Sequence, residues 1–535
     1  MPATSSPRTR WFALIVLALT QLVVVLDGTI VNIALPQAQH ALGLTDGQRQ
    51  WVVTAYALAF GALLLLGGRI ADYWGRKRTY IVGMLGFGAA SLYGGLAQTG
   101  LDLIIARGLQ GVFAALLAPA ALALLTVTFP SGRDRNVAFA VFGTVAGAGA
   151  AVGLVLGGVL TEFTDWRWCL LVNLFFVAVG VVGALLFLTE SKAEGDNRYD
   201  WPGAVVVTLG LGALVYGFSL AELGWGNPAT IGFLAAGVLL LALFVWIESR
   251  TTQPLLPLRI VTDRVRGGAF LIQAVAGSVM IGATLYLTFH LQIVLGMSAF
   301  WAGLASLPIP LGTMLAAPFV TKMLPKAGPR PMLIVGPLIV AAALLFLSRI
   351  TPDGSYAIEV LPALIVMGIG MAFIFVPLQN LALAGVAPHD AGAASATANS
   401  AMQIGGSVGL SVFTAVYAAA LGDTAMSPAA LTSAYGATFV AAAIGMVPAA
   451  IFATSDAGRW DAAIVHRSAS GRSCANDSCT TSGLRKTSTT PSGAPGYPAK
   501  SKIVLGSGTP RAEPEPSRIW ITVAKSITPP SGAAP

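Results

Sequence analysis

Charged side chains occur inside two of the long apolar stretches of this sequence. Asp27 lies within residues 11–35, and Arg107 lies within residues 101–125. A charge inside an apolar helix is expensive, so such a residue normally faces a partner or a water-filled cavity. Both residues are therefore candidates for handling charge in an apolar environment, and Asp27 is a candidate partner of Arg107.

Simpler explanations exist for each charge. Asp27 can lie near the membrane edge and hydrogen-bond a helix end, and Arg107, which is close to Thr99, can extend to the membrane surface. His290, near the end of a later stretch, resembles a proton carrier by residue type. We interpret it instead as a hydrogen-bonded polar residue.

The composition is that of a membrane protein. Of the 535 residues, 55% are apolar and only 10% are charged, and the mean hydropathy is +0.76. Soluble domains have about 25% charged residues. The first stretch, from Trp11 to Pro36, is too long for the core of a signal peptide. We predict an all-α polytopic membrane protein whose charge of +8 reflects basic loops, with no nucleic-acid partner.

Fourteen apolar stretches are each long enough to cross a bilayer as a helix. They are residues 11–35, 51–67, 80–98, 101–125, 137–160, 168–189, 201–221, 229–247, 267–290, 300–321, 331–349, 358–383, 402–421 and 433–454. One set of alternate connections holds seventeen basic residues, and the other holds three, Arg49, Arg167 and Arg349. Basic connections stay on the cytoplasmic side, so both termini are predicted to be cytoplasmic.

The composition changes after about residue 456. Residues 1–456 form the predicted membrane domain, and residues 457–535, rich in Ser, Thr, Pro, Gly and basic residues, form a predicted disordered cytoplasmic tail. Cys474 and Cys479 lie in this tail with no histidine at ligand spacing, and Cys169 lies in an apolar stretch. We expect no disulfide framework, no metal site and no cofactor.

A strongly basic turn separates the second and third stretches. It reads Gly68-Arg-Ile-Ala-Asp72-Tyr-Trp-Gly75-Arg76-Lys-Arg78. Gly68 and Gly75 permit a tight turn. Asp72 can pair with an arginine or accept hydrogen bonds from a helix N-terminus. The alternative is an ordinary loop whose basic residues only fix the topology.

Glycine recurs along the fifth stretch. The positions are Gly143, Gly147, Gly149, Gly153, Gly157 and Gly158. Glycines four residues apart lie on one helix face and let another helix approach closely. A nucleotide-binding loop is excluded because no strand precedes this membrane-spanning segment.

Together these features resemble the fourteen-span drug/proton antiporters of the major facilitator superfamily. The matching motifs include Leu26–Pro36, the basic turn and the glycine stretch. The resemblance implies that Asp27 binds a proton or attracts a cation, with Asn32 as a polar cavity neighbour. It implies that Arg107, with Gln110, belongs to the proton-transfer machinery. It also implies that the basic turn latches the outward-facing state, and that the glycine stretch distinguishes exporters from uptake carriers.

The sequence departs from the family pattern at several positions. Tyr73 replaces a basic residue after Asp72, which implies a weaker latch. Leu154 replaces the proline of the glycine motif, which weakens its exporter meaning. Met402 stands where the family has arginine, and Phe175 replaces a proline.

The resemblance implies a major facilitator fold, with two six-helix bundles and a helix pair, spans 7 and 8, inserted between them. We predict proton-driven export of hydrophobic or amphipathic small molecules by alternating access. The expected setting is a bacterial cell membrane, and the expected partners of this monomer are its substrate, protons and lipid. Motifs for catalysis or phosphate binding are absent, so no enzyme is expected.

Other functions stay open at this stage. They are a proton-linked importer, a narrow-specificity metabolite exporter, and a membrane sensor or scaffold that uses the basic tail. The glycine-rich fifth stretch argues against the importer, and the coupling motifs argue against the sensor.

Overall fold

The computed structural model describes residues 7–130, 132–192, 200–220, 224–251, 254–256, 258–382, 386, 391–422 and 427–455. These residues all belong to one unit, Met1–Ala475. They form helices and connections with no β-strand among them, so the predicted all-α class is confirmed. The predicted tail lies outside the described residues, and its boundary at residue 456 stays a prediction.

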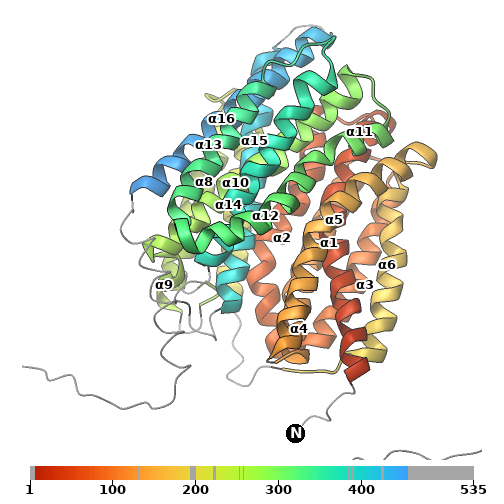
Figure 1. The fold of residues 1–535 in the computed structure, drawn as a ribbon, viewed down its shortest axis with the longest axis vertical. Coiled ribbons are helices and arrows are strands. Elements are labelled where there is room, and N and C mark those ends of the chain that lie inside the picture. The colour runs from red at the N-terminus through yellow and green to blue at the C-terminus, as the bar shows by residue number, and fades with distance from the viewer. Residues whose placement is uncertain are drawn as a thin grey trace, which may run out of the picture. The chain divides into compact units, whose positions relative to one another are not determined.

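Two groups of long helices make up this unit (Figure 1). The first, here the N bundle, contains α1 (Pro7–Leu42), α2 (Asp46–Trp74), α3 (Arg76–Gly95), α4 (Gly100–Thr128), α5 (Arg133–Phe163) and α6 (Trp168–Phe187). A helix pair follows, α7 (Trp201–Ser219) and α8 (Pro228–Arg250), and then the short α9 (Leu258–Val261). The second group, the C bundle, contains α10 (Arg264–Phe289) with the π-helical turn η2 (His290–Val294), α11 (Ala299–Ser306), α12 (Pro308–Ala327), α13 (Pro329–Leu347), η3 (Tyr356–Val360), α14 (Leu361–Ala382), α15 (Ala391–Leu421) and α16 (Pro428–Ser455).

Thirteen helical segments among the described residues are long and apolar enough to cross a membrane. The one predicted span outside these thirteen is the third, residues 80–98, which corresponds to α3; this helix has 20 residues and begins with Arg76, Lys77 and Arg78. These basic residues and five glycines lower its hydropathy. It nevertheless packs against α4 and α6 within the N bundle. The tenth predicted span corresponds to α11 and α12 together, which form one continuous segment.

Side-chain caps fix where two of these helices begin. Thr45 Oγ1 accepts from the backbone N–H of Gln48 at 3.2 Å, and Gln48 Oε1 accepts from the N–H of Thr45 at 3.1 Å. Thr99 and Asp102 form the same reciprocal pair at the start of α4. Such a capping box satisfies N–H groups that have no partner within the helix. It therefore sets the register of every residue that comes after it in the helix, including Arg107.

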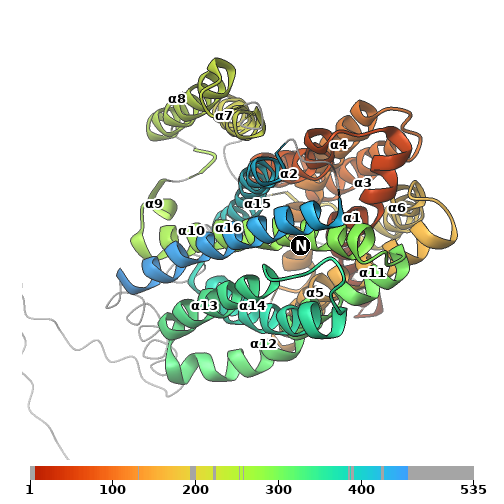
Figure 2. The ribbon, with the colours of Figure 1, turned by 90° about the horizontal axis from the view of Figure 1, so that it is seen from above.

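The α7–α8 pair lies to one side of both bundles, next to α2 and α15 (Figure 2). Trp51 Nε1 of α2 donates to Ser219 Oγ of α7 at 3.2 Å. The pair is inserted between the bundles in sequence but packs on their flank.

The two ends of the helices are named by the connections that they carry (Figure 1). The upper end is the one at which α1 ends and α2 begins. The lower end is the one at which α2 ends and α3 begins. Arg49 and the start of α2 therefore lie at the upper end, and the basic turn lies at the lower end.

Candidate functional site

A buried ion pair joins α1 to α4. Asp27, near the middle of α1, has no exposed surface, and Arg107 is 1% exposed. Arg107 Nη1 lies 2.5 Å from Asp27 Oδ2. The structure thus brings together two charges that the sequence places in separate spans. It contradicts the simpler explanations, in which Asp27 hydrogen-bonds a helix end at the membrane edge or Arg107 extends to the membrane surface.

Gln110 closes a ring of hydrogen bonds with this pair. It lies one helical turn after Arg107 and is completely buried. Its Oε1 accepts from Arg107 Nη1 at 2.7 Å, and its Nε2 donates to Asp27 Oδ1 at 3.0 Å. The amide therefore holds both charged groups in one geometry.

Two residues without a predicted role complete the network. Asn173 Nδ2 of α6 donates to Asp27 Oδ1 at 2.8 Å, and Ser91 Oγ of α3 accepts from Gln110 Nε2 at 2.8 Å. Both side chains are fully buried. An amide inside the apolar α6 is a usable sequence signal for Asn173, but a serine in a helix as rich in small residues as α3 gives none.

The second helix covers the remaining side of the arginine. Arg107 Nε donates to the backbone carbonyl of Val52 at 3.2 Å, and the guanidinium lies 4.4 Å from the centre of the Tyr56 ring. Tyr56 is itself held by a hydrogen bond to the Val24 carbonyl at 3.1 Å. Four of the N-bundle helices, α1, α2, α4 and α6, therefore contact the ion pair directly.

The ion pair links the position of α1 to the charge on Asp27. A buried carboxylate is tolerable only when its charge is balanced and its oxygens are hydrogen-bonded, and Asp27 meets both conditions. Protonation of Asp27 would remove the charge that balances Arg107. The guanidinium would then depend on Gln110, Val52 and the Tyr56 ring. Proton binding at this carboxylate can thus change how α1 is held against α4.

Asn32 does not join the hydrogen-bond network of Asp27, and its role as a polar cavity neighbour stays a prediction. Five residues along an α-helix rotate a side chain by about 140° from its starting direction. Asn32 is buried on this other face of α1, and its Oδ1 has no hydrogen-bond partner among the described residues.

The glycines of α5 bring that helix against the segment of α1 that carries Asp27. A methyl group at Gly153 would lie 3.0 Å from the Leu26 carbonyl oxygen, and one at Gly157 would lie 2.9 Å from the Ile30 carbonyl oxygen. A methyl group at Gly149 would lie 3.1 Å from the Cβ atom of the Val25 side chain. The predicted close helix approach is therefore present, and α1 rests on α5 with no side chain of these glycines between them.

The upper end of α5 contacts the C bundle. A methyl group at Gly158 would lie 2.8 Å from the Ala299 carbonyl oxygen of α11. Glu162 Oε2 accepts from the backbone N–H of Phe300 at 2.9 Å. Leu154, which stands where the family has proline, is buried against Ile33 and Ala299. The same helix therefore packs on Asp27's segment and on the second bundle.

The basic turn is shorter than predicted. Most of the stretch from Gly68 is helical, because α2 continues to Trp74, and the turn is confined to Gly75 with φ of +130°. The prediction that Gly68 permits a tight turn is wrong, since a methyl group there would make only an ordinary contact with Pro119 at 3.6 Å. The close helix contact lies one residue earlier, where Gly67 faces the Ala115 carbonyl.

Ion pairs hold this turn within the N bundle. Asp72 Oδ1 accepts from Arg76 Nη2 at 2.7 Å, which selects the arginine pairing among the alternatives. The Glu190 carboxylate, just beyond α6, accepts from the backbone N–H of Lys77 at 3.0 Å and from that of Arg78 at 3.1 Å. A carboxylate at the N-terminus of α3 is favoured by the helix dipole. Within the described residues, the ion pairs of Asp72 with Arg76 and of Arg78 with Glu190 do not reach the C bundle.

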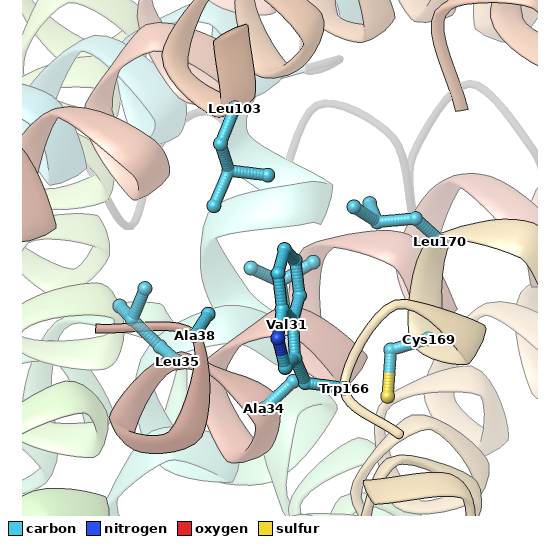
Figure 3. Close-up of a pocket in the computed structure, with 8 residues that line it drawn as sticks. All are labelled: Val31, Ala34, Leu35, Ala38, Leu103, Trp166, Cys169 and Leu170. Atoms are coloured by element: carbon cyan, nitrogen blue, oxygen red, sulfur yellow. The ribbon is translucent and has the colours of Figure 1, made fainter. Parts of the chain in front are cut away.

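A small apolar cavity, whose lining includes residues one helical turn from Asp27 and from Arg107, is too small for a substrate (Figure 3). Its volume is about 10 Å³, and its lining includes Val31, Leu103 and the indole of Trp166. A larger hollow of about 580 Å³ lies at the upper end, between α1, the α5–α6 connection and the segment from η2 to α11. Drug-sized ligands occupy pockets of roughly 300–1,000 Å³. The upper hollow is in that range.

Comparison with known proteins gives consistent results. The family model described as Major Facilitator Superfamily matches residues 17–410. The puromycin resistance protein pur8 of Streptomyces alboniger is 47% identical over 79% of this chain and 85% of its own length. The cephamycin export protein of Amycolatopsis lactamdurans is 38% identical over 84% and 93%. A crystal structure of tetrameric PepTSo2 has a TM-score of 0.58 at 17% identity over 83% of this chain and 97% of that one, which shows likeness of fold.

The close contact of the α5 glycines with α1 predicts that adding a methyl group lowers the stability of the protein at some glycine positions of α5 and not at others. Gly157→Ala places a methyl group against the Ile30 carbonyl, so we expect a loss of about 1–3 kcal/mol in stability, as overpacking produces. The measurement is the thermal unfolding midpoint of the purified protein. Gly143→Ala on the same helix is the control, because nothing lies within 4 Å of the added group. Equal midpoints for the two variants would contradict the close contact.

The turn between α2 and α3 predicts a contrast between its two glycines. Gly75→Ala forces a side chain into a φ of +130° and against the Glu190 carboxyl at 2.9 Å, so we expect a cost of about 1–3 kcal/mol. Gly68→Ala replaces a helical glycine that has room for a methyl group, and we expect it to be neutral or stabilising. Unfolding midpoints of both variants test the assignment. A larger loss of stability in Gly68→Ala than in Gly75→Ala would instead support the longer turn predicted from the sequence.

Proposed function

The chain belongs to the major facilitator superfamily, and from that membership and its buried site we propose that it is a proton-driven exporter of hydrophobic or amphipathic small molecules. The observation that carries the proposal is the Asp27–Arg107 pair, fully buried and held by Gln110 and Asn173. A buried ion pair in a membrane span is a marker of ion or proton handling. The two named relatives, a puromycin resistance protein and a cephamycin export protein, support the outward direction of transport and the class of substrate.

Proton binding would bias the conformation through α1. Ionised Asp27 ties α1 to α4 and α6, and protonation loosens this tie. Breaking a buried pair by neutralising one partner costs about 3–5 kcal/mol. A change of about 5.5 kcal/mol moves a two-state equilibrium from 1:99 to 99:1. The free-energy change caused by one proton at this carboxylate is therefore large enough to favour one conformation over the other.

The glycine face of α5 provides a route from the proton site to the bundle interface. Gly153 and Gly157 contact the backbone of α1 on either side of Asp27's turn, and Gly158 contacts α11. The glycines place α1 directly against α5, so a displacement of α1 is passed to α5 by contact. A shift of α1 would therefore reach the contact between α5 and the C bundle at the upper end, where the two bundles must separate for release.

The upper hollow suits the exit of amphipathic cations. Its lining combines both bundles and includes Glu162, Asp165 and Trp166. The carboxylates of Glu162 and Asp165 attract a cation. This supports hydrophobic or amphipathic cations as a substrate class.

The topology follows from the basic residues. Arg76, Lys77 and Arg78 lie at the lower end, together with the start of α1. Because basic connections stay on the cytoplasmic side, the lower end is cytoplasmic and the upper end faces outward. We assign the protein to the bacterial cell membrane, with both termini inside, as a monomeric transporter and not an enzyme.

The Asp27 carboxylate supplies the test. In inverted vesicles containing the full chain, ethidium uptake driven by an acidic lumen should fall by about tenfold or more in Asp27→Asn, since the proton-dependent switch is lost. Asp134→Asn, the same change at an exposed carboxylate at the start of α5, should transport as the wild type does. Asp27→Glu keeps the titratable group, and some proton-dependent uptake should remain.

Three outcomes would contradict the proposal. Unchanged proton-coupled uptake in Asp27→Asn would remove that residue from coupling. Substrate movement in the opposite direction under the same gradient would favour the proton-linked importer. A wild type that moves only one metabolite and no ethidium would identify the narrow-specificity exporter.

A further inference from the structure

An arginine of the N bundle is enclosed by aromatic rings of the C bundle at the upper end. Arg49, in the first turn of α2, is 3% exposed. Its guanidinium carbon lies 4.3 Å from the centre of the Phe289 ring of α10 and 5.4 Å from that of Tyr417 of α15. A guanidinium within about 6 Å of a ring centre makes a cation–π contact. The charge of one bundle is thus held by the rings of the other.

These rings form a built cluster, here called the aromatic box: Tyr286, Phe289, His290, Tyr417 and Tyr435. Tyr417 and Tyr435 stack with centres 5.6 Å apart, and Tyr286 lies 5.5 Å from the first and 5.9 Å from the second. A hydrogen bond of 2.9 Å from Tyr286 Oη to Thr414 Oγ1 fixes its ring. All five members are almost completely buried. The box belongs entirely to α10, η2, α15 and α16.

Two polar atoms of the box have no partner. Tyr435 Oη and His290 Nδ1 are buried without a hydrogen bond among the described residues, so the interpretation of His290 as a hydrogen-bonded polar residue is not confirmed at this atom. A buried polar group without a partner is costly, and such groups often mark a place where a ligand or water binds. Arg49 fills the box without satisfying either atom.

The counter-ion of Arg49 is not part of the box. Asp46, one turn earlier on α2, lies with Oδ1 2.9 Å from Arg49 Nη1. When α2 moves away, both charges leave together, and a cluster of electron-rich faces without a carboxylate remains. Such a site suits a bulky, weakly hydrated organic cation, which ring faces bind without an ion pair.

Separation of the bundles at the upper end must withdraw Arg49. Gln50 Nε2, the next residue of α2, donates to Ser411 Oγ of α15 at 2.5 Å, so the same turn is attached twice to the C bundle. Gln292 Nε2 of η2 likewise donates to the Ile33 carbonyl of α1 at 2.9 Å. Alternating access requires these contacts to break when the site opens outward.

We propose that the aromatic box is an organic-cation binding site that Arg49 occupies whenever the upper end is closed. In the open state the box receives the exported cation. As the end closes, the guanidinium re-enters and displaces it outward, so Arg49 acts as an intramolecular competitor. This inference rests on the proposed export function and adds a second location for its substrates, distinct from Asp27.

Binding of tetraphenylphosphonium to the purified full-length protein in lipid nanodiscs tests the competition. Arg49→Ala removes the competitor, so its Kd measured by calorimetry should be about fivefold or more below that of the wild type. Arg49→Gln keeps a polar side chain beside Asp46 and should shift the Kd in the same direction, which guards against one misfolded variant. Arg349→Ala removes another upper-end arginine, which is exposed just beyond α13, and should change nothing.

The box itself is tested by adding Phe289→Leu to Arg49→Ala, which keeps apolar volume but removes a ring face. The gain in affinity should disappear. A gain that persists would assign the cation to the freed Asp46 carboxylate and overturn the proposal, as would the absence of any gain in both Arg49 variants. If wild-type vesicles export the cation while the Arg49 variants bind it no more tightly, only the box fails. Lack of any wild-type export would instead count against the proposed function.

Discussion

The structure of the N bundle depends on one constraint: a carboxylate and a guanidinium that are buried away from water inside a membrane must have their charges balanced and their hydrogen bonds satisfied. Asp27 and Arg107 meet it only because Gln110, Asn173 and Tyr56 occupy the rest of their contact surface. Each of these groups comes from a fixed register on its own helix, so the pair determines how α1, α2, α4 and α6 are placed relative to one another. A cost of several kcal/mol for an unpaired buried charge makes this placement cooperative.

The same constraint explains why α5 has so few side chains facing α1. If the ion pair fixes α1 on the α4 side, any change in that pair must be accommodated on the other side. Gly149, Gly153 and Gly157 let the backbone of α1 and the small side chains of Val25 and Thr29 lie directly against α5 there. Packed cores resist continuous deformation. The hydrogen-bonded ion pair on one side of α1 and the close glycine contact on the other side are therefore complementary features of the bundle.

The sequence predicted the spans and the main charged pair because both depend on local chemistry. Apolar length identifies a span without reference to its neighbours, and a charge inside a span needs a partner wherever that partner lies. Ser91 could not be found, because a buried serine looks like any small residue until its neighbour is known. Asn32 lies outside the hydrogen-bond network because a motif gives proximity in sequence, whereas helix rotation decides which face a side chain occupies. Gly68 was misread because the position where apolar residues end need not be the position where the helix ends.

Arg49 shows the limit of reading basic residues only as topology signals. It is one of the three basic residues in the set of connections that was predicted to lie outside the cytoplasm. The sequence offers no other reason to single it out. Its aromatic partners come from segments more than two hundred residues later, so no local pattern links them. Yet its burial is energetically intelligible: Asp46 and the ring faces together replace the water that the guanidinium loses. Arg49 is stably buried only while the rings of the C bundle surround it. Its burial therefore depends on whether the two bundles are in contact at the upper end.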